Sequence, residues 1–118
     1  MLVGAQAGPI LDRLRRPSET VHAPHLLDLE IAQTLRGSIL RGQITAAHGR
    51  QALDAFRDMA ITRYAHSPLL PRIWELRATI TAYDAAYVAL AESLGAPLLT
   101  RDGRLGRAPG HRALVEVM

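Results

Sequence analysis

Residues 81–105 read TAYDAAYVALAESLGAPLLTRDGRL, and this stretch decides the fold. Residues 85–91 are apolar on nearly every side, which predicts a buried helix over 82–94, ended by Gly95. The short apolar run at 96–100 predicts a buried strand directly after it. Helices that alternate with short buried strands are typical of α/β proteins with a parallel sheet covered on both faces.

The rest of the chain continues this alternation. Further helices are expected at 5–15, 25–42, 45–59 and 67–80, and further strands at 20–24, 60–65 and 113–117. Thr45 is the expected N-cap of the helix at 45–59. Because there is no repeat, linker or low-complexity tract, we expect residues 1–118 to form a single domain.

The composition narrows the function classes. The chain has 118 residues and no cysteine, which excludes disulfides and Cys-based zinc sites. No apolar run is long enough to span a membrane, and the first residues do not have the layout of a signal peptide, so we expect a cytoplasmic protein without a membrane partner. The net charge is +3, and all 14 basic residues are arginine. This surplus permits a nucleic-acid partner, although a GC-rich genome explains the arginines equally well.

Two aspartates stand at the borders of the predicted core. Asp102 follows the strand at 96–100 and so lies at the carboxyl edge of the sheet, where α/β proteins bind ligands. It could instead serve the Asp-Gly turn or cap the short segment after it. Asp84 lies in the first turn of a buried helix, where a carboxylate needs a cation or several donors. Its alternative is a capping box with Thr81.

A third carboxylate, Glu30, lies in the second turn of the helix that follows the strand at 20–24, unless it is an ordinary exposed glutamate. Acids from three separate elements form the hard-oxygen set that Mg²⁺ or Mn²⁺ prefers, and such a site permits phosphodiester hydrolysis. The chain lacks the glycine-rich dinucleotide and P-loop motifs and the G-x-S-x-G motif. These absences weaken the dinucleotide-binding, NTPase and α/β-hydrolase alternatives.

Three segments together resemble a known family. They are APHLLDLEIAQTLR (23–36), LLPRIWELRATITAYDAAYVALAESLGAPLLTRDGRL (69–105) and APGHRALVEV (108–117). They are similar to VapC toxins, the PIN-domain endoribonucleases of type II toxin–antitoxin modules. The resemblance implies a three-layer α/β/α sandwich and RNA cleavage dependent on Mg²⁺ or Mn²⁺. It also implies a VapB-type antitoxin as partner, and a homodimer.

The resemblance also implies roles for individual residues. Glu30, Asp84 and Asp102 correspond to the second, third and fourth acids of the family's metal site, and Thr100 would support them with its hydroxyl. The residues expected to contact RNA phosphates, unless they are solvated surface arginines, are Arg101, Arg104 and Arg107.

The chain departs from the family pattern at its N-terminus. The family's first acid lies in a strand of the type V-D-A-S, whereas this chain begins MLVGAQAGPILDRL. We therefore expect either a true start that lies upstream or an N-terminally shortened domain without the central strand and without the first acid, because Asp12 comes too late to replace it. Thr79 stands where the family often has asparagine.

Loss of one carboxylate should lower metal affinity, so weak or absent nuclease activity is expected. An alternative is a protein that binds an antitoxin or a full-length toxin without catalysis. A receiver-like domain is a weaker alternative, because it needs a lysine and the chain has none.

Overall fold

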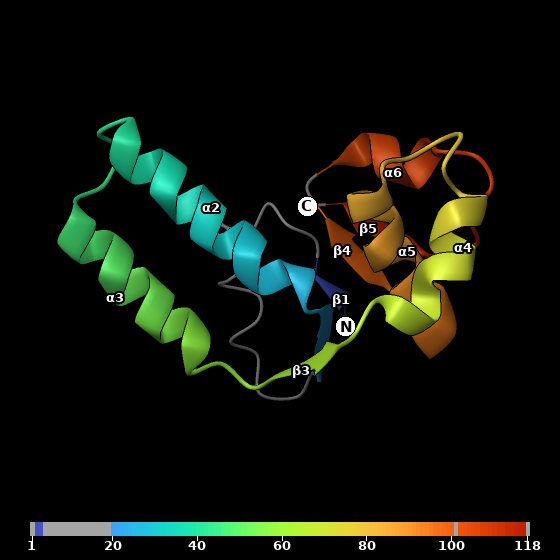
Figure 1. Ribbon diagram of the computed structural model, residues 1–118, viewed down its shortest axis with the longest axis horizontal. Coiled ribbons are helices and arrows are strands. Elements are labelled where there is room, and N and C mark those ends of the chain that lie inside the picture. Colours follow the sequence, from blue (N-terminus) through green and yellow to red (C-terminus); the bar gives the residue numbers. More distant parts are fainter. Residues whose placement is uncertain (1, 4–19, 101, 118) are drawn as a thin grey trace.

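The computed structural model describes residues 2–3, 20–100 and 102–117. Within this part of the chain, five parallel strands form one sheet in the order β3-β2-β1-β4-β5 (Figure 1). The strands are β1 (Leu2–Val3), β2 (Val21–Pro24), β3 (Ile61–Tyr64), β4 (Leu98–Thr100) and β5 (Val115–Val117). The predicted α/β class with a parallel sheet is confirmed.

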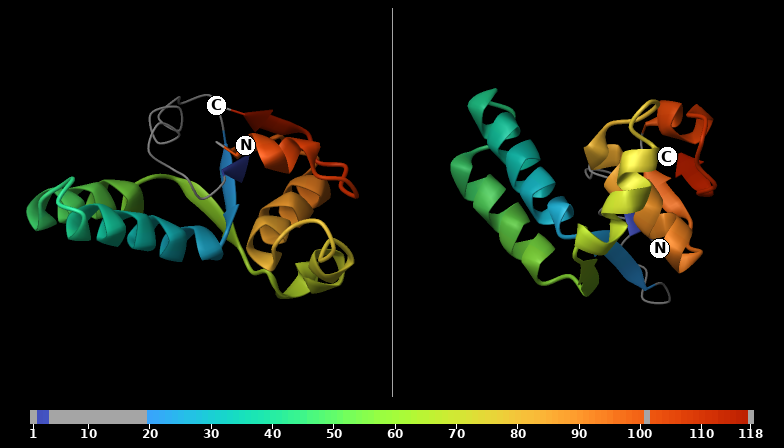
Figure 2. Two further views of the ribbon diagram at one scale, coloured as in Figure 1. Left: turned by 90° about the horizontal axis from the view of Figure 1, so that it is seen from above. Right: turned by 45° about the vertical axis from the view of Figure 1, so that its right-hand side comes forward.

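The helices lie in two groups. α2 (Leu26–Leu40) and α3 (Ala46–Arg57) form a pair that extends away from the sheet (Figures 1 and 2). The second group contains η1 (Ser67–Leu69), α4 (Leu70–Glu75), α5 (Ala82–Leu94) and α6 (Gly103–Arg107). Thr45 caps α3 as predicted, because its hydroxyl accepts a hydrogen bond from the amide of His48 at 3.0 Å.

Helix α5 is the centre of the core. Every residue from Ala85 to Ala91 is buried, and the helix packs against β1, β2 and β4. At its start the Thr81 hydroxyl accepts from the amide of Asp84 at 3.1 Å, which is half of the predicted capping box. At its end Gly95 has φ +61°, a left-handed conformation that favours glycine. The helix predicted from residues 82–94 is confirmed with both of its ends.

The expectation that the central strand is missing is wrong. β1 lies between β2 and β4 and pairs in parallel with both, with Leu2 in register with His22 and Leu98. It therefore supplies the backbone partners that both neighbours need. A strand of two residues is too short to show a periodic pattern in the sequence, which is why only the structure reveals it.

Two of the helices predicted from the sequence, over 67–80 and 5–15, do not appear as predicted among the described residues. The helix predicted over 67–80 stops at Glu75, and a turn follows in which the Thr79 hydroxyl donates to the carbonyl of Pro109 at 3.0 Å. That contact joins segments 30 residues apart and cannot be read from local periodicity. The helix predicted at 5–15 lies outside the described residues. Among the described helices, none is long and apolar enough to cross a membrane.

Candidate active site

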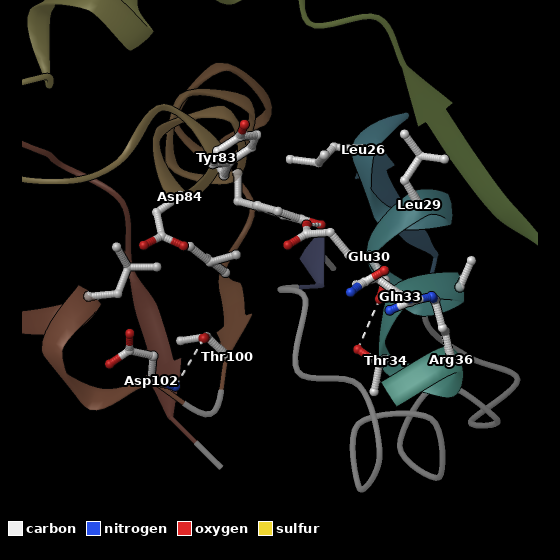
Figure 3. Close-up of a pocket in the computed structure, with 14 residues that line it drawn as sticks. Leu26, Leu29, Glu30, Gln33, Thr34, Arg36, Tyr83, Asp84, Thr100 and Asp102 are labelled. Atoms are coloured by element: carbon white, nitrogen blue, oxygen red, sulfur yellow. Dashed lines mark hydrogen bonds between the residues drawn. The ribbon is translucent and has the colours of Figure 1, made fainter. Parts of the chain in front are cut away.

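Four of the residues predicted from the sequence line one cleft. Glu30 comes from α2, Asp84 from the first turn of α5, Thr100 from the end of β4, and Asp102 caps α6. The cleft has a volume of about 780 Å³. Figure 3 shows Asp84 and Asp102 on one side of it and Glu30 reaching in from α2 on the other. Side chains separated by up to 72 positions thus meet at the carboxyl edge of the sheet.

Asp102 is held by its neighbours in the chain. The buried Thr100 hydroxyl accepts from the Asp102 amide at 3.1 Å. The Asp102 carboxylate caps α6 by accepting from the Arg104 amide at 2.9 Å, and the Arg104 guanidinium donates to both of its oxygens at 3.2 Å. These bonds hold the pKa of Asp102 below its usual range, the side-chain bond from Arg104 being the largest cause.

The pKa of Asp84 is shifted in the opposite direction. Partial burial raises the pKa of its carboxyl, and the negative charge of Asp102 raises it further. The two aspartates therefore repel each other when both are ionised. A cation near both carboxylates would relieve this repulsion.

Glu30 is fixed by a residue that the sequence analysis did not identify. The hydroxyl of the buried Tyr87 donates a hydrogen bond to the Glu30 carboxylate. Burial raises the pKa of Glu30, this hydrogen bond opposes the rise, and the charge of Asp84 adds to it. Tyr87 lies three residues after Asp84 on α5, so both face the same side of the helix. That spacing is the signal by which the sequence could have pointed to Tyr87.

The donor set fits a hard divalent cation. Among the described residues, no group of three or more carboxylates and imidazoles is close enough to hold one ion together. Mg²⁺, however, is commonly held by one or two protein carboxylates together with waters and substrate phosphate. Asp84 and Asp102, which line the same side of the cleft and whose charges interact, would supply these carboxylates, with Glu30 on the opposite side.

Of the three arginines predicted to contact RNA, the structure describes two, and both are exposed on α6. Arg104 is exposed and bonded to Asp102, and Arg107 is exposed on the last turn of α6. Arg101 lies outside the described residues. The cleft is lined instead by Arg36 and Gln33 of α2, which the sequence analysis missed. Gln33 lies three residues after Glu30, and Arg36 lies three residues after Gln33, and each of these steps is a spacing of neighbours on a helix surface that would have pointed to them.

A family model and a curated relative both match most of this chain. The family model described as PIN domain matches residues 5–110 of this chain. Ribonuclease VapC9 of Mycobacterium tuberculosis is 52% identical over 88 residues, which cover 75% of this chain and 69% of that protein.

Two solved structures share the fold. The crystal structure of PAE2754 from Pyrobaculum aerophilum has a TM-score of 0.77 at 23% identity and covers 98% of this chain and 82% of that one. The crystal structure of VapBC2 from Rickettsia felis, bound to a DNA fragment from its promoter, has a TM-score of 0.69 at 14% identity. It covers 98% of this chain and 96% of that one. At these identities the two structures support the fold and not a particular activity.

Proposed function

The chain belongs to the PIN-domain family and, within it, to the VapC ribonucleases, and we propose that it is a metal-dependent endoribonuclease. It would act in the cytoplasm as the toxin of a type II VapBC module, as a single-domain protein that forms homodimers. Its antitoxin would be of the VapB type. Support for an antitoxin partner comes from the identity to VapC ribonucleases, and the VapBC2 structure shares the fold.

One observation carries the proposal. Glu30, Asp84 and Asp102 come from three elements and line the same cleft at the carboxyl edge of the sheet. Asp84 is partly buried and repelled by Asp102, which is costly for the folded state. An arrangement that costs stability in this way is typical of functional sites.

The chain's own residues would share the work as follows. Asp84 and Asp102 would hold Mg²⁺ or Mn²⁺, and Thr100 would keep Asp102 in place through the bond to its amide. Because no three acids among the described residues are close enough to hold one ion, we propose for Glu30, in place of the ligand role predicted from the sequence, that it orients the attacking water from the opposite wall, held by Tyr87. A bound divalent cation would supply an activated water and neutralise charge on the phosphate. Without a cation, these three acids would repel RNA.

The test is cleavage of a fluorogenic RNA in the presence of Mg²⁺ or Mn²⁺, with EDTA as the metal-free control. Asp84→Asn should reduce cleavage about 10- to 100-fold or more, because it removes one of two carboxylates that hold the cation. The matched control is Asp54→Asn, in which a half-exposed acid on α3, away from the cleft, is replaced and cleavage should persist. Cleavage that survives both EDTA and Asp84→Asn would refute the proposal.

A second candidate function rests on the identity of the residue that follows β1. The residue after β1 is Gly4, whereas the family pattern has an aspartate in the corresponding strand. A site with one carboxylate fewer binds metal less tightly, which favours a protein that engages an antitoxin or a full-length toxin without cleaving RNA. Copurification with an antitoxin, combined with no RNA cleavage at any Mn²⁺ concentration, would identify this function. Cleavage abolished by Asp84→Asn would exclude it.

A further inference from the structure

A second, smaller cleft shares both aspartates with the first. Its volume is about 240 Å³, and its polar lining consists of Thr79, Thr81, Asp84, Asp102 and Arg104. The two aspartates therefore stand on the ridge between two hollows. A nucleic-acid strand that crosses this ridge would place one phosphate at the aspartates and a neighbouring phosphate in the smaller cleft.

Arg104 is the basic residue of this smaller cleft. Its side chain is 85% exposed, and its guanidinium forms a fork on Asp102, with Nε and Nη2 each 3.2 Å from a carboxylate oxygen. The guanidinium has further N–H donors that this fork leaves unused. An exposed ion pair of this kind is weak, so the side chain can leave Asp102 at little cost.

The net charge of the smaller cleft decides when Arg104 would leave Asp102. Two carboxylates and one guanidinium leave the smaller cleft with one net negative charge, which disfavours a phosphate. A divalent cation at the aspartates changes that to one net positive charge. The same cation makes the pairing of Arg104 with Asp102 redundant, because Asp102 then has a stronger partner.

Building on the proposed function, we propose that Arg104 exchanges partners. It neutralises Asp102 while the aspartates hold no divalent cation, and it turns to an RNA phosphate in the smaller cleft once a cation takes its place. Arg104 is in this sense a positioning residue for the substrate. The exchange makes RNA binding depend on prior binding of the cation.

The first measurement uses no RNA. Mn²⁺ is titrated by calorimetry into the wild type, Arg104→Gln and Arg107→Gln. Because Arg104 competes with the cation for Asp102, Arg104→Gln should bind Mn²⁺ about two- to fivefold more tightly, the range expected for an exposed ion pair. Arg107→Gln removes the same charge from α6 without breaking the fork on Asp102, and should change the affinity by a smaller factor. Equal tightening in both variants, no tightening in Arg104→Gln, or no Mn²⁺ binding in any of the three proteins would overturn the proposal.

The second measurement follows a labelled RNA by stopped-flow fluorescence anisotropy, before product forms, in Mn²⁺ and in EDTA. Arg104→Gln should weaken RNA binding about three- to tenfold in Mn²⁺ and by a clearly smaller factor in EDTA, where only the change in net charge acts. A loss of equal size in both conditions, or no loss in Mn²⁺, would contradict the exchange. If the wild type binds Mn²⁺ and RNA but cleaves nothing, the proposed nuclease activity fails, while the role of Arg104 is still decided by these binding constants.

Discussion

At the scale of single residues, Asp84 and Asp102 share one cleft, but their surroundings act on them in opposite directions. Burial and the charge of Asp102 raise the pKa of Asp84, so folding disfavours its ionised form. Hydrogen bonds from Arg104 lower the pKa of Asp102, so folding favours its ionised form. The two aspartates should therefore contribute to stability with opposite signs at neutral pH.

This difference predicts the effect of two matched substitutions. Asp84→Asn should raise the free energy of unfolding at pH 7 by roughly 0.5 kcal/mol, after allowance for solvent screening, although it reduces the proposed activity. A raised carboxyl pKa penalises the folded state only where the group ionises, so the gain should disappear below about pH 4. Urea denaturation at the two pH values measures it.

Asp102→Asn is the control in the same cleft. It removes the ion pair with Arg104 and should lower stability at pH 7 rather than raise it. If both variants shift the urea midpoint in the same direction, the opposite roles assigned to the two aspartates are wrong.

At the scale of elements, α5 positions the site, and both of its ends are specified locally. Gly95 ends the helix with φ +61° and has open space around it, so the conformation rather than crowding requires glycine there. A side chain in this conformation meets its own backbone, which costs roughly 1 kcal/mol. The end of α5 therefore sets where β4 begins and, with it, the position of Thr100 at the end of that strand.

We predict that Gly95→Ala lowers the free energy of unfolding by roughly 1 kcal/mol. Gly37→Ala in the interior of α2 should do the reverse and add up to about 1 kcal/mol, because alanine is the better helix former. An added Cβ at Gly37 would meet only the flexible end of the Arg41 side chain, at 2.9 Å, which can move aside. Chemical denaturation of the pair tests the prediction, and stabilisation by Gly95→Ala would contradict it.

At the scale of the whole molecule, one ion-pair network ties three segments together. Arg72 of α4 donates to both oxygens of Glu92 on α5 at 2.8 and 3.0 Å, and to the carbonyl of Gly110 at 2.8 Å. Glu92 also accepts from the amide of Arg112 at 2.6 Å. The network thereby fixes the segment that leads into the edge strand β5.

The network predicts how stability depends on pH. The bond from Arg72 is the main reason that the pKa of Glu92 is lowered. A lowered carboxyl pKa stabilises the folded state above the unfolded pKa of about 4.5, and this contribution is lost as the pH falls through the folded value. Glu92→Gln should cost about 1–2 kcal/mol at pH 7 and much less at pH 3. Thermal or urea unfolding at both pH values measures the difference.

Glu75→Gln provides the control for this prediction. Glu75 bonds the same arginine at 2.9 Å, but its side chain is 64% exposed, against 8% for Glu92. It should cost a few tenths of a kcal/mol at pH 7. A loss equal to that of Glu92→Gln would show that burial of Glu92 does not strengthen the pair.

The sequence by itself determined the alternation of helices and strands, the buried helix α5 with its cap at Thr81 and its end at Gly95, and the carboxylates that line the cleft. These features follow from short-range causes: hydrophobic periodicity, capping and turn chemistry act between neighbours in the chain. The same local causes place Asp84 and Asp102 at the edge of the core.

Only the tertiary structure decided the features that join distant segments. The two residues of β1 become the central strand because two neighbouring strands pair with them, and not because of a local pattern. The bond from Tyr87 to Glu30 links residues 57 positions apart. Such contacts depend on how helices pack across the sheet, which composition and spacing leave undetermined, and the same packing brings Asp84 and Asp102 to one cleft.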